Sequence, residues 1–120
     1  MTFPLRYEAD LDAADDLPDG GDLLAQAFAA CLLQTLERSA THLRLRYDHA
    51  SVHVSVERHG SPPSFCRLAY ELELETDESP GRVDLLHRNL LRQGPVTSTL
   101  AKALEIRGSV RVRERAPASV

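Results

Sequence analysis

The residues best able to do covalent chemistry in this chain of 120 residues are its two cysteines, Cys31 and Cys66. A thiolate is a strong nucleophile that peroxides oxidise, so each thiol is a candidate for redox chemistry. Cys31 lies in the middle of the most apolar stretch, LLAQAFAACLLQTLERSA, whereas Cys66 lies in an alternating segment. Free cysteine is often buried, so position alone favours a structural role for both. Reactivity at Cys31 requires a cation supplied by the fold or by another chain, because Arg38 is about 10 Å further along the predicted helix.

Other kinds of site find little support in the sequence. His49 and His53 are four residues apart, but along a strand this spacing spans about 13 Å, too far for one zinc ion. The remaining histidines have no partner at ligand spacing, and the sequence has no glycine-rich phosphate loop and no serine nucleophile elbow. We therefore expect no metal and no cofactor.

Charge and hydropathy exclude further classes of function. The net charge is −4, and the only arginine-rich segment alternates with valine, as on the exposed face of an edge strand, so we expect no nucleic-acid partner. That segment contains Arg107, Arg111, Arg113 and Arg115. The sequence has no apolar run of membrane-spanning length and no recognisable signal peptide. Two cysteines do not make a disulfide framework, so we expect a cytoplasmic protein with reduced thiols and no membrane partner.

The periodicity of the chain predicts a single α+β domain over residues 1–120, with an antiparallel sheet and central helices. Residues 1–21 are expected to form a strand (3–11) and a loop, and residues 114–120 a flexible tail. Asp22 is expected to cap a helix over 23–40, Ser79 to begin one over 77–94, and Thr97 or Ser98 to cap a short one that ends at 104. The remaining strands are expected at 43–47, 51–57, 65–76 and 105–114. Because the core has no tryptophan, we expect that a dimer is needed for folding.

Two blocks of the sequence resemble the OsmC/Ohr family, named for osmotically inducible protein C and organic hydroperoxide resistance. The first, DLLAQAFAAC, runs from Asp22 to Cys31, and it is similar to the family's helix with Ala-Ala-Cys or Ala-Gly-Cys. The second, GPVTSTLAKALEI, runs from Gly94 to Ile106, and it is similar to the family's Cys-Pro-Val-Ser helix and the strand that follows. The resemblance covers roughly residues 20–113.

The resemblance implies an intertwined homodimer in the cytoplasm that reduces organic hydroperoxides during oxidative stress. A reactive cysteine at the dimer interface forms a sulfenic acid, a second cysteine resolves it, and an external thiol or dithiol reduces the disulfide. Cys31 falls on the peroxidatic position. Asp22 falls near the acidic position, where the family usually has Glu, and Arg6 is the N-terminal candidate for stabilising the thiolate.

The chain departs from the family pattern at the resolving position, which Gly94 occupies. Three interpretations stay open. The protein is a one-Cys peroxidase recycled by an external thiol, or Cys66 reaches Cys31 within the dimer. In the third, it is a non-catalytic member whose fold binds a small apolar ligand or a partner.

Overall fold

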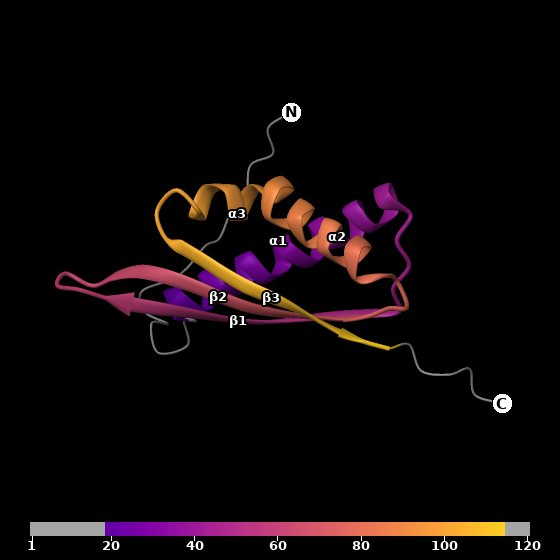
Figure 1. Ribbon diagram of the computed structural model, residues 1–120. Coiled ribbons are helices and arrows are strands. Elements are labelled where there is room, and N and C mark those ends of the chain that lie inside the picture. The colour runs from indigo at the N-terminus through magenta and orange to yellow at the C-terminus, as the bar shows by residue number, and fades with distance from the viewer. Residues whose placement is uncertain (1–18, 115–120) are drawn as a thin grey trace, which may run out of the picture.

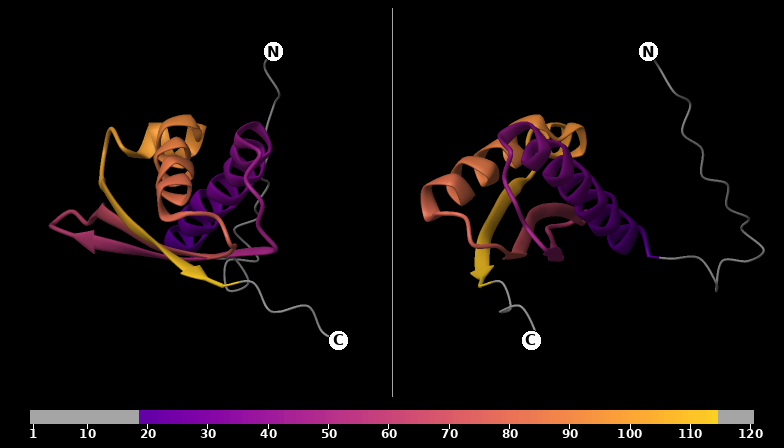
Figure 2. Two further views of the ribbon diagram at one scale, coloured as in Figure 1. Left: turned by 45° about the vertical axis from the view of Figure 1, so that its right-hand side comes forward. Right: turned by 90° about the vertical axis from the view of Figure 1, so that its right-hand side faces the viewer.

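The computed structural model describes residues 19–114, which form one three-stranded sheet with three helices on one face (Figures 1 and 2). In chain order the elements are α1 (Gly20–Leu43), β1 (His49–His59), β2 (Ser64–Glu75), α2 (Pro80–Gln93), α3 (Pro95–Leu100) and β3 (Glu105–Arg113). The α+β class is confirmed. The strand expected at residues 3–11, and all but the first residue of the expected tail, lie outside the described residues.

The sheet is mixed, so the prediction of an antiparallel sheet is wrong for one of its two ladders. β1 and β2 are antiparallel, but β2 and β3 are parallel, with Leu72 opposite Val110. The two helices between β2 and β3 return the chain to the end of the sheet where β2 begins, so β3 runs in the same direction as β2. Such a crossover allows parallel pairing. Alternation in the sequence identifies the buried face of a strand but not its direction.

The chain from Leu43 to Tyr47 was expected to be a strand, and this prediction is wrong. Leu43 is the last residue of α1, and Arg44 adopts a left-handed conformation (φ 54°) that ends the helix. The Leu45 N–H then donates to the Ala40 carbonyl at 2.8 Å, and the Leu45 side chain is buried. An apolar contact just after a left-handed cap is common, and here it produces the same spacing of leucines as a strand.

Helix boundaries depend on caps that the sequence indicated only in part. Ser79 does begin α2, where its hydroxyl accepts from the Arg82 N–H. α1 begins earlier than expected, because Asp19 is its cap and accepts from the Gly21 N–H at 2.7 Å. Gly94 is the cap of α3, without a side-chain hydrogen bond, so the expectation that Thr97 or Ser98 caps this helix is wrong.

The core lies between the helices and the inner face of the sheet. α1 packs against β1 on one side and against α2 and α3 on another, as its almost wholly apolar middle predicts. The fully buried large side chains include Phe28, Leu32, Leu36, Leu68, Leu72, Leu74, Leu86 and Leu90. No helix among the described residues is both long and apolar enough to cross a membrane.

The outer face of the sheet is polar and exposed, as the alternation of β3 predicts. Arg67 on β2 bridges Glu105 (3.0 Å) and Glu57 (3.4 Å), and Arg113 on β3 pairs with glutamates of β2. The hydrogen bond from Arg67 lowers the pKa of the Glu105 carboxyl. The arginines at 67 and 113 are therefore used within the sheet.

Candidate functional site

Cys31 lies at the middle of α1 with its side chain only 6% exposed. Its neighbours Phe28 and Leu32 point into the core, so much of the surroundings of the thiol is apolar. A polar group is nevertheless close, because Thr35 lies one helical turn further and its Oγ1 is 4.0 Å from Cys31 Sγ. Either atom can donate in this contact.

Gly94 lies directly against the thiol. It is the residue between α2 and α3, and a Cβ atom built on it would be 3.0 Å from Cys31 Sγ. The same point is 3.1 Å from Thr97 Oγ1 and 3.4 Å from Thr35 Oγ1. The two sequence blocks, 63 positions apart at Cys31 and Gly94, thus meet at one place in the fold. The position where the resemblance expects a resolving cysteine is the position adjacent to the candidate nucleophile.

Thr97, on α3, contributes an unusual polar atom to this place. Its side chain is 2% exposed, and its Oγ1 is the one buried side-chain oxygen or nitrogen of residues 19–114 with no hydrogen-bond partner. A buried hydroxyl without a partner is costly, so such groups in folded proteins commonly have a functional cause or meet a ligand.

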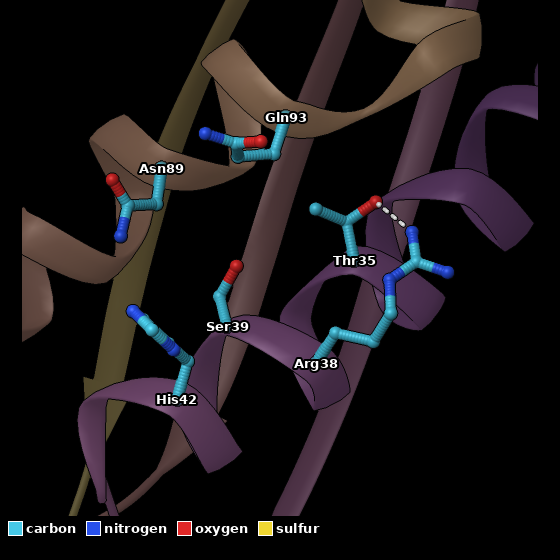
Figure 3. Close-up of a pocket in the computed structure, with 6 residues that line it drawn as sticks. All are labelled: Thr35, Arg38, Ser39, His42, Asn89 and Gln93. Atoms are coloured by element: carbon cyan, nitrogen blue, oxygen red, sulfur yellow. Dashed lines mark hydrogen bonds between the residues drawn. The ribbon is translucent and has the colours of Figure 1, made fainter.

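A polar cavity of about 460 Å³ opens beside Thr35, between α1 and α2 (Figure 3). α1 contributes Thr35, Arg38, Ser39 and His42, and α2 contributes Asn89 and Gln93. The Arg38 guanidinium turns back along α1 and donates to Thr35 Oγ1 at 3.4 Å. Arg38 is thus connected to the sulfur only through the Thr35 hydroxyl. Among residues 19–114 no guanidinium forms a hydrogen bond with Sγ itself.

The other candidate residues lie elsewhere. Asp22 is exposed in the first turn of α1, roughly 13 Å by helical rise from Cys31 in the same chain. Arg6 lies outside the described residues. Cys66 is exposed on β2, where its thiol donates to the Glu57 carbonyl, and no disulfide joins it to Cys31 within the chain. His49 and His53 are exposed on β1, and no three potential ligands of a metal converge within residues 19–114.

A second polar pair is half-buried where α2 covers the sheet. Tyr70 on β2 and His87 on α2 share a hydrogen bond of 2.5 Å between Oη and Nε2. Burial raises the pKa of Tyr70 to about 12 and lowers the pKa of His87. A neutral imidazole that accepts a hydrogen bond from the tyrosine hydroxyl fits both the raised pKa of Tyr70 and the lowered pKa of His87. The pair does not contact Cys31, and we assign it a structural role.

Sequence reasoning missed Thr35, Thr97 and the reach of Arg38. The spacing of Cys31, Thr35 and Arg38 places them on one face of a helix, which was visible, but the helical rise alone suggested that the guanidinium was too distant. A long side chain can cover one turn backwards, since side chains lean toward the start of a helix. Thr97 was indistinguishable from an ordinary helix cap.

Comparison with known proteins agrees with this architecture. The sequence profile of the OsmC-like protein family matches residues 13–108. A search of curated proteins found no match.

Solved structures share the fold at low identity. An OsmC-like protein from Mycoplasma pneumoniae is 17% identical, with a TM-score of 0.68 over 78% of this chain and 70% of that one. An organic hydroperoxide resistance protein OsmC from Legionella pneumophila is 18% identical, with a TM-score of 0.70 over 78% and 69%. The organic hydroperoxide resistance protein OhrB of Bacillus subtilis is 16% identical, with a TM-score of 0.64 over 82% and 76%. With a family profile matched over most of its length and the same fold, the chain belongs to the OsmC-like protein family.

Proposed function

We propose that this protein is a thiol-dependent peroxidase for organic hydroperoxides, with Cys31 as the nucleophile and an external thiol as the reductant. The observation that carries the proposal is the set of polar groups around Cys31 Sγ. Thr35 Oγ1 lies 4.0 Å from the sulfur and receives a hydrogen bond from Arg38. A structural cysteine in a core needs neither a hydroxyl nor a cation behind it.

Arg38 brings a positive charge near the sulfur through Thr35. Because the guanidinium donates to Thr35 Oγ1, the hydroxyl hydrogen is free to point at the sulfur. A hydrogen-bond donor and a cation are the kinds of group that accompany a reactive cysteine. A direct cation, such as Arg6 or a residue of a second subunit in the homodimer that we propose, would add to them.

Gly94 determines how the cycle closes. The sulfenic acid formed on Cys31 has no thiol at position 94 to attack it, and Cys66 is exposed on β2. An external thiol then forms a mixed disulfide and releases water, and a second thiol restores Cys31 as a disulfide leaves. We place the approach of this thiol at the polar cavity beside Thr35, whose Oγ1 is 4.0 Å from the sulfur.

A non-catalytic binding role is the second candidate, and the 6% exposure of Cys31 favours it, because a buried sulfur is hard for a substrate to reach. An apolar recess of about 340 Å³ between α2 and β3, lined in part by Val83, Val110 and Val112, would then hold the ligand. Reactivity of Cys31 separates the two functions.

The test treats the protein with one equivalent of cumene hydroperoxide and then with a sulfenic-acid probe. A peroxidase gives an adduct on Cys31 in the wild type and in Cys66→Ser, but not in Cys31→Ser. Turnover is then followed as peroxide consumption with dithiothreitol, lipoamide or thioredoxin as reductant. A folded protein that gives no adduct on Cys31 would leave only the binding role. Light scattering tests the homodimer in the same samples, and a stable folded monomer would contradict it.

A further inference from the structure

Gly94 brings its backbone against the candidate nucleophile. The point where a Cβ on Gly94 would lie is 3.0 Å from Cys31 Sγ, 3.1 Å from Thr97 Oγ1 and 3.4 Å from Thr35 Oγ1, so a side chain would fit only if these neighbours shifted. One sulfur and two hydroxyl oxygens therefore surround this point. Gly94 has φ −75° and ψ 125°, which any residue adopts, so the backbone conformation itself does not require glycine here.

The hydroxyls of Thr35 and Thr97 can each donate a hydrogen bond. Thr97 Oγ1 is buried and has no partner in the described part of the chain, so its hydrogen is unused. Thr35 Oγ1 accepts from Arg38, which leaves its own hydrogen available as well. Two donors beside an otherwise apolar thiol suit an acceptor that is small and arrives at the sulfur.

We propose that Thr97 donates a hydrogen bond to the oxygen atom that Cys31 takes from a hydroperoxide, beside the backbone of Gly94. This inference rests on the proposed function. In the step, the Cys31 thiolate attacks the outer oxygen of ROOH, the S–O bond forms and the O–O bond breaks. The sulfur is oxidised by two electrons to S–OH, and the alkoxide leaves with the electron pair and takes a proton from water to become ROH.

The sulfenic oxygen then completes the hydrogen bonding of Thr97. A hydroxyl left unsatisfied in the reduced protein becomes satisfied in the oxidised one, so the site favours the sulfenic acid over the thiol.

The experiment measures the lifetime of the Cys31 sulfenic acid in the Cys66→Ser background, where Cys31 is the remaining thiol. The protein is oxidised with one equivalent of cumene hydroperoxide, and a dimedone probe is added after increasing delays. A second equivalent of hydroperoxide is added at the start of the delay, because oxidation to the sulfinic acid consumes another hydroperoxide. Mass spectrometry reports the adduct and the sulfinic acid that replaces it. The variants are Thr97→Val, which has the same shape without the donor, Thr97→Ser, which keeps the donor, and Gly94→Ala, which places a Cβ against the sulfur. Circular dichroism confirms that each is folded.

Thr97→Val is expected to shorten the lifetime about fivefold, as expected for the loss of one hydrogen bond, with Thr97→Ser restoring most of it. Gly94→Ala is expected to slow formation of the adduct, because its Cβ would lie 3.0 Å from Cys31 Sγ and crowd the approach to the sulfur. If the Cys66→Ser parent forms the adduct and folded Thr97→Val matches it in lifetime, the inference is overturned while the peroxidase proposal stands. If the parent forms no adduct, both are overturned.

Discussion

Substituting Gly94 by cysteine tests the central geometric claim, that position 94 lies against the sulfur of Cys31. A sulfur atom in a disulfide is about 3 Å from the Cβ of the partner cysteine, as the bond lengths and angles require. The ideal Cβ at position 94 is 3.0 Å from Cys31 Sγ, and φ −75° suits cysteine. We therefore expect Gly94→Cys to form a disulfide with Cys31 with little movement of the backbone.

The size of the effect follows from the loop that this bond closes. A loop of roughly 60 residues lowers the entropy of the unfolded chain enough to stabilise the fold by about 4 kcal/mol. The new Cβ also lies 3.1 Å from Thr97 Oγ1, which is a tight contact, so this figure is an upper value. Urea denaturation of the oxidised and reduced forms of Gly94→Cys, in the Cys66→Ser background, measures the difference.

Gly81→Cys is the matched control, because a Cβ at Gly81 meets no atom within 4 Å. Thiol titration is expected to find no free thiol in oxidised Gly94→Cys and two in the control. A non-reducing gel is expected to show that the bond is within one chain. Two free thiols in a folded, air-oxidised Gly94→Cys protein would refute the adjacency of the two sequence blocks and, with it, the inference about the oxygen.

Three further predictions concern stability. Gly108→Ala is expected to cost about 3 kcal/mol in urea denaturation, because its Cβ would overlap the Tyr70 ring, whereas Gly81→Ala is expected to cost nothing; equal stabilities would contradict the packing. Burial lowers the pKa of His87, so the unfolded chain binds a proton at a higher pH than the folded one. The contribution of His87 to stability is therefore full above about pH 6.5 and falls as the pH drops below it. His87→Gln is expected to flatten this acid slope in denaturation midpoints measured from pH 7 to 5, and an unchanged slope would exclude His87 as its cause. Thr97→Val is expected to leave the reduced protein as stable as the wild type or up to about 1 kcal/mol more stable, since it removes a buried hydroxyl without a partner; a clear loss of stability in thermal denaturation would show that the hydroxyl is bonded.

Much of the fold could be predicted because buried side chains recur in the sequence with the period of a helix or a strand. The alternation from Phe65 to Thr76 and the apolar stretch around Cys31 gave the right elements in the right order. The errors occurred where one local pattern fits two structures. The spacing of Leu43 and Leu45 fits a strand or a helix end with a left-handed cap, and only the fold distinguishes them.

The site was predictable only as two separate pieces. The resemblance pointed to Cys31 and to position 94, but no pattern along the chain states that they lie together, since long-range contacts depend on the packing of α1 against α2 and α3. The polar atoms around the sulfur were harder still. Whether Thr97 is a cap or a buried donor depends on where α3 begins, and α3 begins at Pro95 because Gly94 takes the cap position.

The combination of Gly94 and Thr97 bears on why a peroxidase would lack a second cysteine. A thiol at position 94 would lie close enough to attack the sulfenic acid at once, so the oxidised state would be a disulfide inside the protein. With glycine there, the proposed peroxidase has no such thiol, and the Thr97 hydroxyl, which has no other partner among the described residues, lies 3.1 Å from the point where the Cβ would be. In the proposed cycle the oxidised sulfur would then persist until an external thiol arrives. Glycine at position 94 and the buried hydroxyl of Thr97 would thus act together, giving a sulfenic acid that waits for its reductant.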